Sequence, residues 1–359
     1  MKTLLKFSLI ALLLHALATP AANTVTNIAQ GCFAGHSLFL KSDGSLWAMG
    51  DNIVNELGDG TFNNTNRPEQ IVASGVTAIA AGNGYSLFLK SDSSLWAMGL
   101  NNYGQLGDGT FNNTNRPEQI VASGVTAIAA GGYHSLFLKS DGSLWAMGLN
   151  NYGQLGDGTY NNINNRPEPS NIINRPEQIV ASGVTAIAAG VDHSLILKSD
   201  GSLWGMGFNV DGELGDGTFN NTNQPEQIVA GGVTSIAAGY EHSLFLKSDG
   251  TLWGMGWNQY GQLGDGFPSD SSLPEQIYPS PQPVLNNVVS SQTNLQLTAT
   301  CGFGGKYYLL GSVDMTLPLI QWSPLRTNSV TTRGTNNFSV TLTNVINSHS
   351  QQFYILQSQ

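Results

Sequence analysis

A block of about 49 residues occurs five times in this chain, and this repetition constrains the fold more than any other feature. One tryptophan marks each copy, at Trp47, Trp96, Trp145, Trp204 and Trp253. The steps are 49, 49, 59 and 49 residues, so ten residues are inserted in the third interval. Such a period, with short strand-like runs and Gly-rich turns, is typical of propeller blades or a β-solenoid. Residues present in every copy are expected to build the repeat, so function is better sought where the copies differ.

Each copy contains the pattern of four short strands. In the third copy, an apolar run covers 125–130, an alternating run covers 135–139 and a third run covers 144–148. Asp141-Gly142 separates the last two runs, and Asp-Gly between apolar runs is a strong hairpin signal. A final extended segment contains Arg-Pro-Glu-Gln-Ile-Val, and its proline indicates an edge strand or a strand beginning. One such antiparallel unit cannot cover its own apolar faces, so neighbouring copies must cover them.

Two turn positions predict unusual backbone conformations. The second copy has Ser93 where the other copies have glycine in the hairpin turn, so this turn is expected to be strained or of another type. The first copy has Asn55 where the others have Gly104, Gly153, Gly212 and Gly261. Asparagine is the residue best able to replace glycine at positive φ, which predicts a left-handed conformation at this position.

The third copy carries a longer motif, from His134 to Gly158, that reads HSLFLKSDGSLWAMGLNNYGQLGDG. Its His-Ser, Asp-Gly and Asn-x-x-Gly-Gln-Leu-Gly elements resemble the regulator of chromosome condensation repeat, and the resemblance covers about residues 25–277. It implies a β-propeller, usually of seven blades. A methionine stands where the family often has an aromatic residue beside the glycine, and altered packing is expected there. Because only five copies are present, a closed five-bladed ring is the first expectation and an open arc the second. The substituted positions are Met49, Met98, Met147, Met206 and Met255.

The segment 285–359 lacks the repeat and predicts a separate small β-sandwich after a Pro-rich linker at 278–284. Its candidate strands are 295–300, 306–310, 338–342 and 352–356. This segment is weakly similar to the terminal β-modules of secreted bacterial proteins, which implies an accessory or surface-association role.

The N-terminus has the three parts of a secretory signal peptide. Lys2 and Lys6 precede the apolar run 7–14, and Ala16-Leu17-Ala18 offers a cleavage site. Residues 1–21 are therefore predicted to be removed, with cleavage near Thr19 or after residue 21, and the chain is expected to be a bacterial-type secreted or cell-surface protein, extracellular or periplasmic. An uncleaved membrane anchor is the alternative, although the apolar run is short for a bilayer.

Export would permit a disulfide between the two cysteines, Cys32 and Cys301. Only Cys32 lies in the repeats, and no other copy contains a cysteine. The sequence does not establish the separation that a bridge requires, so two unpaired thiols are the simpler interpretation.

Composition argues against one class of partner. Only 11% of the residues are charged and the formal net charge is −10. Nucleic-acid binding requires clustered Lys and Arg to neutralise phosphates, and the sequence has no such cluster. Nucleic acid is therefore not an expected partner.

The repeated polar residues are interpreted as structural. Four histidines share one repeat position without ligands at metal spacing, and a hydrogen bond to backbone is the expected role of each. Asp59, Asn63 and Asn64 could offer oxygens to calcium, but an Asx-turn explains them with fewer assumptions. The sequence contains no phosphate loop, nucleophile elbow or HExxH motif, so neither an enzyme nor a cofactor is expected. The histidines are His36, His134, His193 and His242, and the second copy has Tyr85 in their place.

The positions that differ between copies predict a recognition face on the loops. Aromatic side chains beside acidic ones are typical of protein or sugar recognition, and a protein or glycan partner is expected. The alternatives are a structural surface spacer, or a nucleotide-exchange regulator if the chain is not exported. We call the following set the recognition face: Tyr103, Tyr133, Tyr152, Asp192, Phe208, Asp211, Tyr240, Glu241, Trp257 and Tyr260.

The ten inserted residues predict a solvated loop. The Asn-Arg-Pro-Glu element occurs at 165–168 and again at 174–177, which indicates a local duplication. Prolines keep such a segment extended and asparagines keep it solvated. Deletion of residues 165–174 would restore the 49-residue step, so we expect the loop to bulge from the array without supporting it.

Overall fold

The computed structural model describes residues 23–29, 31, 34–160 and 173–278, and beyond these the backbone of six further strands. The predicted signal peptide, Cys32 and residues 161–172 of the insertion lie outside the described residues.

Each repeat forms one four-stranded antiparallel sheet whose strands follow chain order. The first sheet contains β1 (Val25–Ala29), β2 (His36–Lys41), β3 (Leu46–Gly50) and β4 (Thr65–Val72). The second contains β5 (Val76–Ala81), β6 (Tyr85–Lys90), β7 (Leu95–Gly99) and β8 (Thr114–Val121). The third contains β9 (Val125–Ala130), β10 (His134–Lys139), β11 (Leu144–Gly148) and β12 (Ile173–Val180). The fourth contains β13 (Val184–Ala189), β14 (His193–Lys198), β15 (Leu203–Gly207) and β16 (Thr222–Val229), and the fifth contains β17 (Val233–Ala238), β18 (His242–Lys247), β19 (Leu252–Gly256) and β20 (Ser271–Tyr278).

The turn residues adopt the predicted backbone conformations. Gly142 in the hairpin between β10 and β11 has φ of 75°, and Ser93 at the same position of the second sheet has φ of 63°. Asn55 has φ of 74°, and Gly104 at the equivalent position also has φ of 74°. Among the described residues, Ser93 and Asn55 are the two non-glycine residues with positive φ. Both predictions are therefore confirmed.

Neighbouring sheets stack through two different apolar faces. One face of a sheet, here called the leucine face, presents the side chains that correspond to Leu136, Leu138 and Leu144 of the third sheet. It packs against the methionine face of the next sheet, formed there by Ile187, Ile196 and Met206. The same pairing joins the first sheet to the second, the second to the third and the fourth to the fifth. Met98, Met147, Met206 and Met255 are fully buried, as expected of adaptable core residues.

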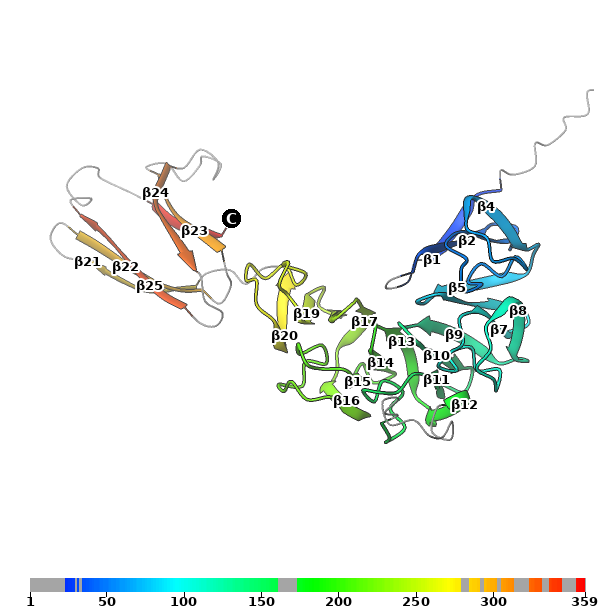
Figure 1. Cartoon of the computed structure of the whole chain (residues 1–359). Coiled ribbons are helices and arrows are strands. Elements are labelled where there is room, and N and C mark those ends of the chain that lie inside the picture. The colour runs from blue at the N-terminus through cyan, green and yellow to red at the C-terminus, as the bar shows by residue number, and fades with distance from the viewer. Residues whose placement is uncertain are drawn as a thin grey trace, which may run out of the picture.

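The five sheets follow one another along an open arc (Figure 1). The first strands of consecutive sheets, β1, β5, β9, β13 and β17, contact one another along the array, and the fourth strands form the opposite sheet edges. Figure 1 shows the first and fifth sheets at the two ends of the arc, apart from each other. The structure thus adopts the second of the two expected arrangements. The four sheet-to-sheet steps within the chain do not complete a turn.

Beyond β20, the backbone forms two three-stranded antiparallel sheets. One has the order β21 (Val284–Ser290), β22 (Asn294–Cys301), β25 (Asn336–Thr343). The other has the order β24 (Ser323–Val330), β23 (Gly305–Ser312), β26 (Phe353–Ser358). These strands include the predicted ones apart from Gln352, which is outside the described residues. Two small sheets agree with the predicted sandwich, and the domain boundaries remain a prediction. Within the described part of the chain, no helix has the length and apolar character needed to cross a membrane.

Candidate recognition face

A buried asparagine holds the loop after the third strand of every sheet. In the third sheet, the Asn150 Nδ2 donates to Asp157 Oδ1 at 2.9 Å, and its Oδ1 accepts from the Leu155 backbone N–H at 3.0 Å. A buried polar group is stable only when its hydrogen bonds are satisfied, so this residue fixes the loop geometry. Sequence reasoning did not single it out because all five copies share it. The equivalent residues are Asn52, Asn101, Asn209 and Asn258.

The repeated histidines bridge neighbouring sheets. The Nε2 of His36 lies 2.8 Å from the Ser86 Oγ in the second sheet, and the corresponding distance from His193 to Ser243 is 3.0 Å. His134 contacts Ser194 in the same way at 2.9 Å. The expected structural role therefore takes a different form, in which the partner is a serine hydroxyl of the next sheet rather than backbone.

The serine also determines which histidine nitrogen carries the proton. The Ser86 Oγ donates to the Glu56 carbonyl oxygen at 2.8 Å, so it accepts from His36, which must be protonated at Nε2. Burial lowers the pKa of His36 to about 4 and the pKa values of His134 and His193 to about 3. These side chains are therefore neutral hydrogen-bond donors near pH 7, which suits a structural role.

Tyr85 performs the same bridging task in the second sheet. Its hydroxyl donates to the His134 carbonyl oxygen at 2.5 Å and lies 3.2 Å from the Ser135 Oγ, which donates to the Gln105 carbonyl oxygen at 2.7 Å. Tyrosine in place of histidine thus preserves an inter-sheet hydrogen bond. Unlike an imidazole, the phenol does not become positively charged in mild acid.

Each repeated tryptophan lies under a lysine, and all but Trp204, which is opposite Ile196, also stack on a phenylalanine ring. The Trp145 ring stacks on Phe137 with centroids 6.1 Å apart, and the Lys139 Nζ lies 4.0 Å from its centroid. Its indole N–H donates to the Ser143 Oγ at 2.9 Å. A lysine lies over Trp47, Trp96, Trp204 and Trp253 in the same way. This repetition is consistent with a structural role.

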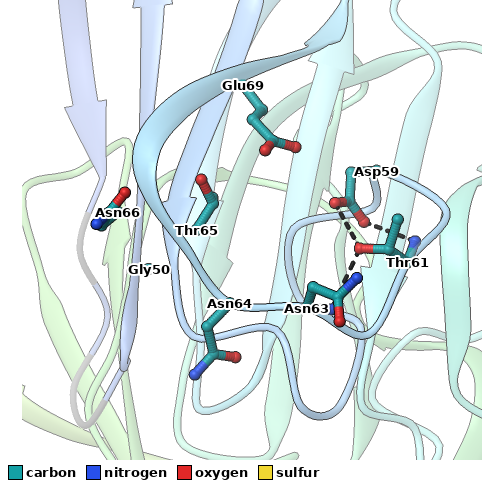
Figure 2. A pocket seen from close by; sticks show the side chains of 8 residues that line it. All are labelled: Gly50, Asp59, Thr61, Asn63, Asn64, Thr65, Asn66 and Glu69. Carbon is teal, nitrogen blue, oxygen red and sulfur yellow. Dashed lines mark hydrogen bonds between the residues drawn. The ribbon is translucent and has the colours of Figure 1, made fainter.

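Asp59, considered above as a calcium ligand, already has hydrogen-bond partners (Figure 2). Its Oδ1 accepts from the Thr61 N–H at 2.7 Å and from Asn52 at 3.0 Å, and its Oδ2 accepts from the Thr61 hydroxyl at 2.8 Å. The Asx-turn is therefore present. A pocket of about 520 Å³ lies beside it, and Figure 2 shows Asn63 turned toward Thr61 while Asn64 lies apart. Over the described ranges, no three His, Cys, Asp or Glu side chains are grouped to hold a metal ion.

The aromatic residues of the recognition face form three groups, two of which cross a sheet boundary. The Tyr103 and Tyr133 ring centroids, from the second and third sheets, are 5.0 Å apart. Tyr152 and Phe208, from the third and fourth sheets, are 4.9 Å apart. In the fifth sheet Trp257 contacts both Tyr240 and Tyr260, at 6.0 and 5.2 Å. Tyr260 is 84% exposed, so the fifth-sheet group of rings includes a side chain that a ligand can contact.

Acidic side chains lie in the same region, on the fourth and fifth sheets. We call Asp192, Asp211, Glu213, Glu241 and Asp270 the acidic patch. Burial, followed by the charges of Asp211, Asp192 and Asp270, raises the pKa of Glu241. Burial raises the pKa of Asp192 to about 6 and that of Glu213 to about 8. The charges that act on Glu241 are thus all carboxylates, and a cationic ligand would relieve their repulsion.

Sequence reasoning missed Glu213, although a signal was available. Three copies have glutamine at this position, where the Gln154 Oε1 accepts from the Tyr152 backbone N–H at 3.0 Å. Glu213 makes the same bond to the Asp211 N–H with one oxygen, and its other oxygen, Oε1, is buried without a hydrogen-bond partner. The residue is fully buried. Its departure from glutamine was the visible signal.

The sheets and their stacking define the class of the protein, a β-propeller built from tandem repeats. A family model described as the RCC1-like domain matches residues 10–229, and models of the RCC1 repeat match residues 233–262 and 249–292. The first match alone covers more than half of the chain. The chain therefore belongs to the regulator of chromosome condensation (RCC1) family.

Solved structures agree on the fold. Human WBSCR16 is 24% identical with a TM-score of 0.63, and the match covers 75% of this chain and 71% of that one. Prp20p from Saccharomyces cerevisiae is 24% identical with a TM-score of 0.59, and the match covers 78% and 72%. Yeast RCC1 (Prp20) bound to Kap60 is 22% identical with a TM-score of 0.60, covering 77% and 69%. No curated protein matches the sequence. At these identities the similarities show the fold alone.

Proposed function

We propose that this chain is an exported, non-enzymatic binding propeller whose recognition face contacts another protein. The observation that carries the proposal is the coincidence of exposed rings with the acidic patch on one set of loops. Aromatic rings supply contact area, and the acidic patch favours Lys or Arg side chains of a partner. The structural relatives support a protein partner in general terms, since yeast RCC1 (Prp20) is bound to Kap60 in its structure and Prp20p is described with binding to Gsp1p and histones.

Export is part of the proposal and is supported by the residue pattern at 1–21. The nucleotide-exchange activity known in the family is not proposed, because export would separate the chain from a nuclear GTPase. Mass spectrometry of the N-terminus of the protein purified from its native host tests this part. A mature N-terminus near residue 19 or 22 supports export, and a retained residue 1 in cytosolic protein contradicts it.

The binding test compares two variants that change the net charge equally. Asp211→Asn with Glu241→Gln removes two charges of the acidic patch, and Glu118→Gln with Glu177→Gln removes two exposed charges from the fourth strands of other sheets. Binding of a Lys- and Arg-rich peptide library to the immobilised protein is measured. We expect the first pair to weaken binding about tenfold and the control pair to leave it within about twofold. Equal losses in both would contradict recognition by the acidic patch.

Tyr260→Ala distinguishes a binding platform from a surface spacer. The side chain is 84% exposed, so its removal should leave the melting temperature unchanged. Loss of partner binding with unchanged stability supports the platform, and unchanged binding supports the spacer.

A glycan is the second candidate ligand, favoured by the same exposed Tyr260 and its neighbour Trp257. Aromatic rings present apolar faces to sugars in the same way as to proteins. A glycan array probed with the wild-type protein and with Trp257→Ala decides between the ligands. Selective loss of glycan signal in the variant would favour the sugar.

A further inference from the structure

We propose that the two ends of the arc bind each other between separate copies of this chain, with the fifth sheet of one copy stacked on the first sheet of the next. The argument rests on the junctions between sheets, which occur four times within one chain. It does not depend on the recognition face.

Every internal junction joins the same two apolar faces. The leucine face of one sheet covers the methionine face of the following sheet, and most of the participating side chains are fully buried. In the third sheet, for example, Leu136 and Leu144 are completely buried on one face and Phe137 and Met147 on the other. A stable array requires both faces to be covered.

At the ends of the arc, one face of each kind is uncovered. In the fifth sheet Leu246 is 41% exposed, whereas its counterparts Leu138 and Leu197 are 3% and 6% exposed. In the first sheet Ile28 is 77% exposed, whereas its counterpart Ile79 is 9% exposed. Phe39 and Met49 are half-buried, although the corresponding side chains in later sheets are buried. The fifth sheet thus has an uncovered leucine face, and the first sheet has an uncovered methionine face. At the internal junctions these two kinds of face cover each other.

The polar groups of the junction are incomplete at the same two ends. His36, His134 and His193 each contact a serine of the next sheet, at 2.8, 2.9 and 3.0 Å. Among the described residues, no such serine meets His242 of the fifth sheet, and no histidine meets Ser37 of the first. His242 occupies the donor position of this contact and Ser37 the acceptor position. In a head-to-tail pair, one chain would supply the histidine and the next chain the serine.

A second polar contact follows the same pattern. The Gly60 N–H donates to the Asn115 carbonyl oxygen of the next sheet at 2.7 Å, and the contact recurs from Gly109 to Asn174 at 2.8 Å. The equivalent groups at the ends are the Gly266 N–H and the carbonyl of Asn66. Asn66 is exposed, whereas Asn115 is half-buried under its neighbour. Figure 2 shows Asn66 at the margin of the first-sheet pocket.

A second copy fits these ends because the two faces lie at opposite ends of one arc (Figure 1). The resulting contact is head-to-tail and uses different surfaces on the two partners, so each joined copy still offers one free end. Such contacts produce either closed rings or open filaments. Association should therefore increase with protein concentration and should not stop at a symmetric dimer unless a ring closes.

The test uses one charged substitution at each end. Ile28→Lys disables the first-sheet end and Leu246→Lys disables the fifth-sheet end, and both positions are exposed, so folding should be preserved. Val210→Lys, at a loop position that is 53% exposed in the fourth sheet, controls for the added charge. Circular dichroism melts first confirm folding, and Phe39→Lys or Leu252→Lys replaces a variant that fails. Sedimentation velocity over a wide concentration range then gives the mass of the full chain.

We expect the wild-type protein and Val210→Lys to associate, and each end variant alone to require at least about tenfold higher concentration. An equimolar mixture of Ile28→Lys and Leu246→Lys should give a discrete dimer, because the mixture retains one native pair of ends. Two results overturn the proposal. One is a wild-type protein that stays monomeric at every concentration. That would mean that the fifth sheet stacks on the first sheet of the same chain, or that the C-terminal strands cover an end face. The other is association that neither end variant weakens.

Discussion

Single residues in the turns illustrate how far the repeat alone predicts the structure. Comparison of copies identified Asn55 and Ser93 as departures from glycine, and both have positive φ. Such positions can be predicted because backbone sterics depend on local geometry. The serine partner of His36 could not be predicted in this way, since it lies 50 residues away in a neighbouring sheet.

The strained turn at Ser93 leads to a stability prediction. A residue with a Cβ in the left-handed region destabilises the folded state by about 1 kcal/mol, and glycine avoids this strain. Part of the gain is offset because glycine makes the unfolded chain more flexible. We expect Ser93→Gly to raise the free energy of unfolding by about 0.5–1 kcal/mol, measured by urea denaturation. Ser93→Ala retains the Cβ and should give no gain. A stabilised alanine variant would show that something other than backbone strain is responsible.

Glu213 leads to a pH-dependent prediction. Its pKa is about 8 in the folded protein, above the ordinary value of 4.5, so the folded state holds a proton that the unfolded state releases between these values. The stability contributed by this group is therefore present below pH 4.5 and is lost as the pH rises toward 8. Glu213→Gln keeps the hydrogen bond to Asp211 N–H and removes the titration. We expect it to stabilise the protein by about 4 kcal/mol at pH 8 and hardly at all at pH 4.5.

Thermal melts of Glu213→Gln and the wild type from pH 4.5 to 8.5 check this expectation. Glu118→Gln, on an exposed part of β8, controls for the loss of one negative charge. A gain that is equal at both ends of the pH range would contradict the assignment of the effect to ionisation of Glu213.

At the scale of elements, the repeat accounts for nearly all of the strands, while the stacking geometry required the structure. Hairpin signals such as Asp141-Gly142 placed β10 and β11 correctly. Whether the array closes depends on how neighbouring sheets pack, for example at the junction that buries Met147 and Phe137, and hairpin signals do not predict this packing. The recognition face was predicted as scattered loop positions, and the structure shows which of their rings touch.

The insertion before β12 leads to a prediction about an element. Deletion of residues 165–174 joins Ile163-Asn164 to Arg175, so the shortened chain regains an Ile-Asn-Arg sequence at the start of the strand. We expect a folded protein whose Tm changes by no more than a few degrees, since surface loops tolerate such changes. Circular dichroism melts measure this, with deletion of 173–180, which removes β12 itself, as a destabilised control. A large loss of stability in the first variant would show that the insertion supports the array.

For the whole molecule, the arc behaves as a one-dimensional stack whose stability decreases toward its ends. Each internal sheet is covered on both faces, and each end sheet on one. In arrays of this kind, stability is approximately a sum over repeats and the interfaces between them. Opening should therefore begin at the first and fifth sheets.

Hydrogen exchange tests this gradient with an internal control. β2, β10 and β18 all have the sequence HSLFLK, so their intrinsic exchange rates match. At low protein concentration we expect β2 and β18 amides to exchange at least about tenfold faster than those of β10, because end sheets open locally at lower free energy. Peptides that include the different preceding residues separate the three signals by mass. Equal protection in all three strands would indicate that the array unfolds as a single cooperative unit.

The prolines of the fourth strands carry a consequence for aggregation. Pro68, Pro117, Pro176, Pro225 and Pro274 each lie in a strand at the edge of its sheet, and irregular register accompanies them. A proline has no N–H to offer an incoming strand, and an interrupted ladder gives that strand a poor template. A protein with five exposed sheet edges and an uncovered apolar face at each end would otherwise be at risk of amyloid-like growth. The prolines oppose lateral strand addition at every sheet, so the surfaces left open to self-association are the broad faces at the ends.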